Sequence, residues 1–95
     1  MTGYSAARFS PGRILMTAGI AALFGERMEV IVDLLLRHLS GDWGDLCAED
    51  RALNEQALAT GSRLLSSYMV GEQVNAWIIT EADRSATTVL LASEY

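Results

Sequence analysis

The sequence has few of the residues that usually mark crosslinks and metal sites. Its 95 residues include no lysine, one proline, one histidine and one cysteine. The single cysteine, Cys47, excludes an intrachain disulfide and is typical of a reducing compartment. No spaced pattern of zinc ligands can be built from one histidine and one cysteine. We therefore expect neither a disulfide framework nor a metal site.

Long apolar runs are also missing. The longest candidate, residues 30–39, is interrupted by Asp33 and Arg37 and is too short to cross a bilayer. The first residues lack the basic start and apolar run of a signal peptide. No phosphate-binding loop, nucleophile elbow or dinucleotide fingerprint is present, so no cofactor is predicted. We expect a soluble, cytoplasmic protein with no membrane partner.

Positive charge is scarce. Seven basic residues, all arginine, face twelve acidic residues, and the formal net charge is -5. A domain with this balance repels phosphate backbones, so nucleic acid is not the expected partner. Nucleic-acid binding would need several arginines on one face and a steep salt dependence. A partner protein with a basic surface fits the charge better.

The apolar content is sufficient for one hydrophobic core. About half of the residues are apolar, which argues against disorder of the whole chain. A chain of this length is too short for two cores. Residues 1–10 hold few large apolar side chains, and we expect a flexible N-terminus there. The sequence predicts a single domain over residues 11–95.

Three helices are predicted, over residues 18–24, 27–39 and 46–60. The second has the strongest helical period, because its apolar side chains recur at spacings of three and four residues: Met28, Ile31, Val32, Leu35, Leu36 and Leu39. Such an apolar helix is either central to the core or covered by another chain. A homodimer through residues 27–39 is therefore one expected assembly.

From residue 63 the apolar period becomes that of a strand. Strands are predicted over residues 63–70, 74–80 and 86–91, with residues 13–16 as a candidate fourth strand. Helices followed by strands indicate an α+β fold. We expect N-terminal helices packed on one face of a three- to four-stranded antiparallel sheet that ends in a β-meander.

Two stretches carry a resemblance. One is Gly41-Asp42-Trp43-Gly44-Asp45-Leu46, and the other is the segment 77–91 with the sequence WIITEADRSATTVLL. They resemble a family of short, functionally uncharacterised bacterial proteins that are commonly carried on plasmids and integrative elements. The resemblance implies an accessory role in a mobile genetic element, such as inhibition of host defence, control of transfer, or regulation. It implies no particular chemistry.

Residues 42–50 combine an indole with four carboxylates: Asp42, Trp43, Asp45, Glu49 and Asp50. As a surface, this segment would bind a basic partner, with Trp43 as the anchor. The structural interpretation, in which the carboxylates cap helices or form a solvated face and Trp43 fills the core beneath the turn, is the more ordinary one. The spacing fits no EF-hand.

A polar constellation around His38 is the alternative site. His38 ends the second helix, where it can act as a general base or simply cap the helix. The set that could join it comprises Asp42 and Asp45 after that helix, and Glu81, Asp83 and Arg84 after the strand 74–80. A local ion pair between Arg84 and Asp83 or Glu81 is the structural interpretation of that loop.

Two hypotheses from different classes follow. The first is a non-enzymatic, protein-binding accessory protein of a mobile element. In its most specific form, this protein inhibits a host defence complex, as anti-CRISPR proteins do. The second is a small enzyme or metal-dependent factor that uses the His38 constellation. They differ in whether His38 and Asp83 share one cleft.

Overall fold

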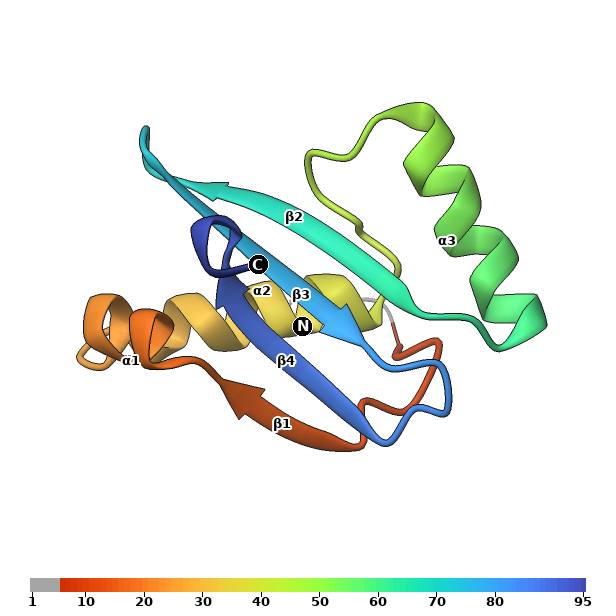
Figure 1. Ribbon diagram of the computed structural model, residues 1–95, viewed down its shortest axis with the longest axis horizontal. Coiled ribbons are helices and arrows are strands. Elements are labelled where there is room, and N and C mark those ends of the chain that lie inside the picture. The colour runs from red at the N-terminus through yellow and green to blue at the C-terminus, as the bar shows by residue number, and fades with distance from the viewer. Residues whose placement is uncertain (1–5) are drawn as a thin grey trace.

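The computed structural model describes residues 6–95, which fold into a four-stranded sheet with helices around it (Figure 1). The strands are β1 (Arg13–Met16), β2 (Leu64–Val70), β3 (Val74–Thr80) and β4 (Ala86–Leu91). The helices are α1 (Ala18–Phe24), α2 (Met28–Leu39), α3 (Ala48–Thr60) and a 3-10 helix, η1 (Ala92–Glu94). The α+β class is confirmed, and most predicted boundaries agree within two residues.

The strands lie in the order β1-β4-β3-β2. β2, β3 and β4 form the predicted antiparallel meander. β1 instead pairs with β4 in parallel, with Arg13 opposite Ala86 and Met16 opposite Val89. The sheet is therefore mixed rather than wholly antiparallel. All three α-helices and two strands separate β1 from β4, and a connection of this length allows two strands to run in the same direction.

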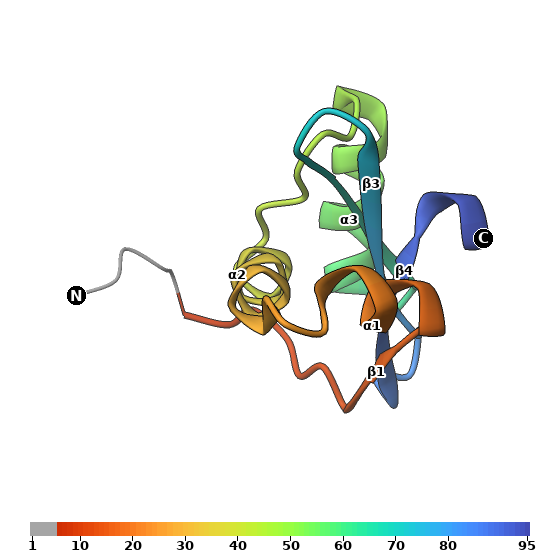
Figure 2. The same ribbon diagram turned by 90° about the vertical axis from the view of Figure 1, so that its left-hand side faces the viewer.

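α2 covers one face of the sheet, and η1 lies on the other face (Figure 2). The core between α2 and the sheet is made by buried side chains from α1, α2 and three strands: Ile20, Phe24, Ile31, Leu34, Tyr68, Ala76, Ile78 and Val89. On the opposite face, the ring centroids of Tyr95 and Trp77 are 5.1 Å apart.

α3 lies beside β2 at the margin of the sheet (Figure 1). Its apolar stripe is thin: Ala57 is buried against Trp43 and Leu64, whereas Leu53 is exposed. The predicted start of this helix is two residues early, since it begins at Ala48. The helix begins later because the carboxylate of Asp45, its predicted N-cap, accepts the Met69 amide instead.

The segment before β1 was predicted to be flexible over residues 1–10, and its first five residues lie outside the described part of the chain. Arg8 and Phe9 are fixed to the domain. The Arg8 amide donates to the Leu39 carbonyl at 2.8 Å, and its guanidinium forms a bidentate pair with Glu55 at 2.9 and 2.8 Å. The Phe9 ring stacks 6.3 Å from the Trp43 ring. Contacts with the domain thus begin before residue 11.

Candidate functional site

Residues 41–46, called the acidic bend below, run along the outer edge of β2. Gly44 forms an isolated parallel bridge with Ser67. The Ser67 amide donates to the Trp43 carbonyl at 3.2 Å, and the Asp45 amide donates to the Ser67 carbonyl at 2.7 Å. The Asp45 carboxylate accepts the Met69 amide at 2.8 Å, so it does not cap α3 as predicted. The bend therefore closes the sheet edge instead of projecting from the surface.

Asn54 of α3 extends this cover to the beginning of β2. Its amide nitrogen donates to the Leu65 carbonyl at 2.6 Å, and its amide oxygen accepts the Leu65 N–H at 3.1 Å. With the bend, this pairs the outward N–H groups of Leu65, Ser67 and Met69. An edge strand with its donors occupied cannot recruit another strand through them.

Gly44 makes the close approach of the bend to β2 possible. It has a φ of 75°, and a Cβ at this position would lie 2.0 Å from the Ser67 carbonyl oxygen. Both the positive φ and the contact exclude any residue with a side chain.

Trp43 is buried, with 3 % of its surface exposed. The two flanking glycines let the chain turn the indole inward, beside Phe9. Its Nε1–H donates to a Glu55 carboxylate oxygen at 3.0 Å, so burial leaves no unpaired donor. The interpretation of Trp43 as a surface anchor is wrong, and the core interpretation is confirmed.

Asp42 also has partners within the chain. Its carboxylate accepts from Arg37 Nε at 2.7 Å, and this hydrogen bond is the main reason why the pKa of Asp42 is lowered. Its carbonyl accepts from the Tyr68 hydroxyl at 2.7 Å. Of the five residues predicted to form the binding surface, only Glu49 and Asp50 are exposed without a hydrogen bond or ion pair among residues 6–95.

His38 is fully buried and belongs to a chain of hydrogen bonds across the sheet. Its Nδ1 contacts the Ser66 hydroxyl, and its Nε2 lies 2.9 Å from Thr80 Oγ1. Thr80 Oγ1 is 2.7 Å from Thr87 Oγ1, which donates to the Pro11 carbonyl at 2.8 Å. Because a carbonyl only accepts, each hydroxyl must donate toward Pro11. This direction places the imidazole proton on Nε2 and leaves Nδ1 to accept from Ser66.

The buried imidazole is therefore neutral and has a structural role. Burial lowers the pKa of His38 to about 4. With its ring enclosed by the Phe9 and Trp43 rings, at centroid distances of 5.3 and 5.7 Å, it has no access to a substrate. A general base needs a ring that a substrate can reach, and the burial of His38 does not supply one. The helix-capping interpretation is wrong, since the ring bonds strand hydroxyls.

The loop between β3 and β4 is a clamp around Arg84, whose φ is 62°. The Arg84 guanidinium donates to four backbone carbonyl oxygens, at 2.6 to 3.2 Å, in the loop itself and at the end of α3: Glu81, Ala82, Ala57 and Ser62. Within residues 6–95 Arg84 forms no ion pair, so the predicted pair with Asp83 or Glu81 is wrong.

The alternative catalytic set is not assembled. The Asp83 carboxylate is exposed and accepts from the Ser85 amide at 3.0 Å. The Phe9 ring contacts both Arg84 and His38, at 5.8 and 5.3 Å, and these two side chains share no hydrogen bond. Across residues 6–95 no group of three or more histidine, cysteine, aspartate or glutamate side chains could hold a metal ion.

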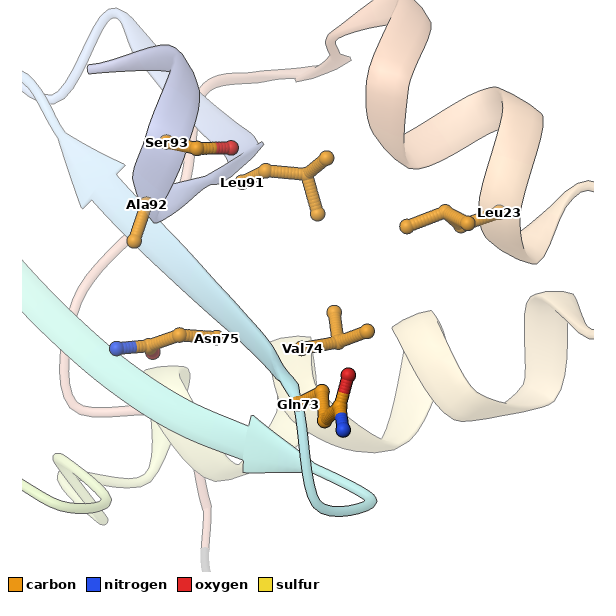
Figure 3. A pocket seen from close by; sticks show the side chains of 7 residues that line it. All are labelled: Leu23, Gln73, Val74, Asn75, Leu91, Ala92 and Ser93. Carbon is orange, nitrogen blue, oxygen red and sulfur yellow. The ribbon is translucent and has the colours of Figure 1, made fainter.

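Three hollows lie on the surface formed by residues 6–95. A pocket of about 340 Å³ lies where α1, β3, β4 and η1 meet (Figure 3), and it is lined by Leu23, Gln73, Val74, Asn75, Leu91, Ala92 and Ser93. Its lining contains no titratable side chain. The second, of about 400 Å³, lies on the outer face of α3 and is lined by Glu49, Asp50, Ala52, Leu53 and Gln56. A third hollow, of about 240 Å³, lies between α3 and β2 and is lined by Leu46, Asp50, Leu53, Asn54, Arg63 and Leu65. The second and third hollows include predicted site residues, whereas the first does not.

Several residues that build this region escaped the sequence analysis. The sequence around Phe9, Asn54 and Glu55 does not indicate that these residues contact Trp43 or the edge of β2. A signal did exist for the hydroxyl chain, because strand alternation places Ser66, Thr80 and Thr87 on the same face as the apolar core. Three hydroxyls on a buried face indicate a polar partner among them, and His38 is the only histidine.

Comparison with protein-family models, with curated proteins and with solved structures yields no match for this chain. In the described part of the chain, no helix has the length and apolar character needed to cross a membrane. The residues that carry the sequence resemblance have roles in the fold: the bend closes β2, and the segment 77–91 supplies the Arg84 clamp and two hydroxyls of the His38 chain.

Proposed function

We propose that the protein is a non-enzymatic binding module that presents the outer face of α3 to a basic, partly apolar surface of a partner protein. The observation that carries the proposal is an exposed leucine beside unpaired carboxylates. Leu53 is 60 % exposed in the hollow that Glu49 and Asp50 also line. A projecting apolar side chain supplies contact energy, and neighbouring charges supply specificity and faster association.

The binding surface is smaller than the sequence predicted and is shifted along the chain. Trp43 leaves it because the indole is in the core, and Asp42 and Asp45 are engaged in hydrogen bonds. The net charge of -5 supports a basic partner and disfavours nucleic acid. A cytoplasmic location and a role in a mobile element, with inhibition of a host defence complex as its most specific form, complete the proposal. The mobile-element role rests on the resemblance of the two signature stretches.

Self-association through residues 27–39 is a further part of the proposal. Met28, Val32 and Leu36 are exposed on α2 at a spacing of four residues, which forms an apolar stripe. The buried residues of the same helix, Ile31 and Leu34, face the core.

A pair of charge-matched variants tests the α3 surface. The test variant is Glu49→Arg with Asp50→Arg and Leu53→Ala. The control variant is Glu26→Arg with Glu72→Arg, which makes the same change in net charge at exposed positions outside α3 and outside residues 27–39. Both are expected to keep the far-UV circular dichroism of the original chain. In pull-downs from host lysate, the test variant is expected to lose partners that the control retains. Identical partner sets for both variants would remove the proposal.

The defence-inhibition form has its own assay. In a bacterial host with an active CRISPR system, expression of the chain is expected to restore transformation by a targeted plasmid. The α3 variant should fail to restore it, and the control variant should succeed. If the chain binds a basic partner but transformation is unchanged, the binding module stands and its role in defence does not.

A further inference from the structure

β1 is an edge strand, and no segment of residues 6–95 pairs with its outer side. The amides of Arg13 and Thr17 donate inward to Ser85 and Val89, at 3.0 and 3.1 Å. In a parallel ladder every second residue faces the partner strand, so Leu15 also faces β4, and the N–H and C=O groups of Ile14 and Met16 face outward. β1 ends the strand order, and both views show no described segment beside its outer side (Figures 1 and 2).

This open edge is also apolar. Ile14, Leu15 and Met16 are 47 %, 39 % and 43 % exposed. Proteins usually protect an open edge with a central charge, a proline or a bulge, and β1 has none of these between residues 14 and 16. The α2 stripe lies on the same side of the domain, because Arg37 on the other flank of α2 reaches toward β2, with its guanidinium carbon 4.8 Å from the Tyr68 ring centroid.

We propose that β1 pairs antiparallel with β1 of a second copy of this chain, which joins two four-stranded sheets into one sheet of eight strands. One register satisfies all the outward groups. Leu15 lies opposite Leu15 of the second copy on the two-fold axis, and Ile14 lies opposite Met16 of the second copy. Each such Ile14–Met16 pair exchanges two backbone hydrogen bonds. This inference is independent of the α3 surface.

Charge complementarity in this register favours a second copy over an unrelated strand. Arg13 falls opposite Thr17 of the second copy, and within residues 6–95 it has no ion pair of its own. The Thr17 hydroxyl donates to a Glu94 carboxylate oxygen at 2.6 Å, and Glu94 also accepts the Gly19 amide at 3.2 Å. Arg13, Thr17 and η1 lie on the same face of the sheet. Pairing therefore brings each Arg13 beside Glu94 of the other copy, twice by symmetry.

Disulfide trapping tests the register. In a Cys47→Ser background, Leu15→Cys should oxidise to a covalent dimer, because directly opposed residues without hydrogen bonds have Cα atoms about 4.5 Å apart. Leu53→Cys in the same background is the control, since it is exposed on α3. An equimolar mixture of Ile14→Cys and Met16→Cys should form the mixed dimer faster than either forms its own. Dimer formation by Leu15→Cys no faster than by Leu53→Cys would overturn the proposal.

Solution mass gives a test that needs no crosslink. The protein in solution should have twice the 10.3 kDa mass of one chain. Leu15→Lys should return it to the monomer, while Leu53→Lys should not.

Arg13→Glu should raise the dissociation constant of the dimer about tenfold through loss of two exposed ion pairs, and Arg13→Lys should preserve it. A monomer at every concentration overturns the inference. So does a dimer that Val32→Lys dissociates and Leu15→Lys leaves intact, since α2 would then carry the contact.

Discussion

The two edges of the sheet differ in how their backbone groups are satisfied. Along β2, the acidic bend and Asn54 bond the outward N–H groups of Leu65, Ser67 and Met69. Along β1, the outward groups of Ile14 and Met16 meet no described part of the chain. The most distinctive segment of the sequence, the acidic bend, therefore covers one edge of the sheet. The surfaces that we propose for partners lie elsewhere, on β1, on the outer face of α3 and on the exposed stripe of α2.

A single chain of hydrogen bonds connects the two edges through the core. It begins at Ser66 on β2, passes through His38 and Thr80 and Thr87 on β3 and β4, and ends at the Pro11 carbonyl before β1. The histidine thus holds α2 and the strands in register with one another. This explains how an isolated histidine can be fully buried, because both of its ring nitrogens have hydrogen-bond partners.

Breaking the cover of β2 should have the largest effect. Gly44→Ala is expected to lower the free energy of unfolding by about 3 to 4 kcal/mol, because it adds backbone strain and a clash with Ser67. Gly71→Ala is the matched control: its φ is 70°, but nothing lies within 4 Å of the added Cβ. That control should cost only about 1 kcal/mol. Urea unfolding measures both, and equal losses would show that the close approach does not matter.

Acid should weaken the chain of hydrogen bonds that passes through His38. The folded pKa of His38, about 4, is below its ordinary value of 6.5, so the unfolded chain binds a proton that the folded chain refuses. The contribution of the neutral His38 side chain to the free energy of unfolding is complete above pH 6.5. It falls by about 3 kcal/mol as pH drops toward 4.

Unfolding free energies of the original chain and His38→Gln, compared across this pH range, isolate that loss. The difference between the two proteins should shrink as pH falls. A constant difference, or an NMR titration of the single imidazole near 6.5, would contradict the buried hydrogen-bond chain.

Removing the side chain that covers Leu65 should have a smaller effect. Asn54→Ala leaves the Leu65 N–H and C=O without their partner and is expected to cost about 2 kcal/mol. Gln56→Ala, on the exposed side of the same helix, should change stability by less than about 0.5 kcal/mol. If the two variants unfold at the same urea concentration, Asn54 does not protect the edge.

The smallest effect is expected at Glu55, whose carboxylate accepts hydrogen bonds from both Arg8 and Trp43. Hydrogen bonds from Arg8, and then from Trp43, lower the pKa of Glu55 to about 2. Its contribution is therefore present above its unfolded pKa of 4.5 and disappears as pH falls toward 2. Glu55→Gln should cost about 1 kcal/mol at neutral pH, as for an exposed bidentate pair. Glu49→Gln is the control, and it should leave the urea midpoint unchanged.

The local pattern was sufficient to predict the elements of this fold. The bounds of β1, α1, β3 and β4 follow from alternation, the Thr17 cap and the loops between them. The parallel pairing of β1 was not predictable, because its partner lies some seventy residues later and a short edge strand carries no mark of direction. Pairing direction depends on the path of the intervening chain.

The site was predicted less well, because its residues find their partners far along the sequence. Asp45 has the pattern of a helix cap, but the Met69 amide competes for it and wins. Trp43 between two glycines fits an exposed turn as well as a buried one, and Phe9 and Glu55 decide between them. Where a polar residue has both a local and a distant partner, a single sequence shows only the local one.

Amide hydrogen exchange, followed residue by residue by NMR at several protein concentrations, tests the contrast between the edges most directly. The amides of Leu65, Ser67 and Met69 should be protected at every concentration, because their partners belong to the same chain. Those of Ile14 and Met16 should exchange rapidly in dilute protein and become protected as its concentration rises. Rapid exchange at Ser67 in dilute protein, or unprotected Ile14 and Met16 amides at high concentration, would contradict the account.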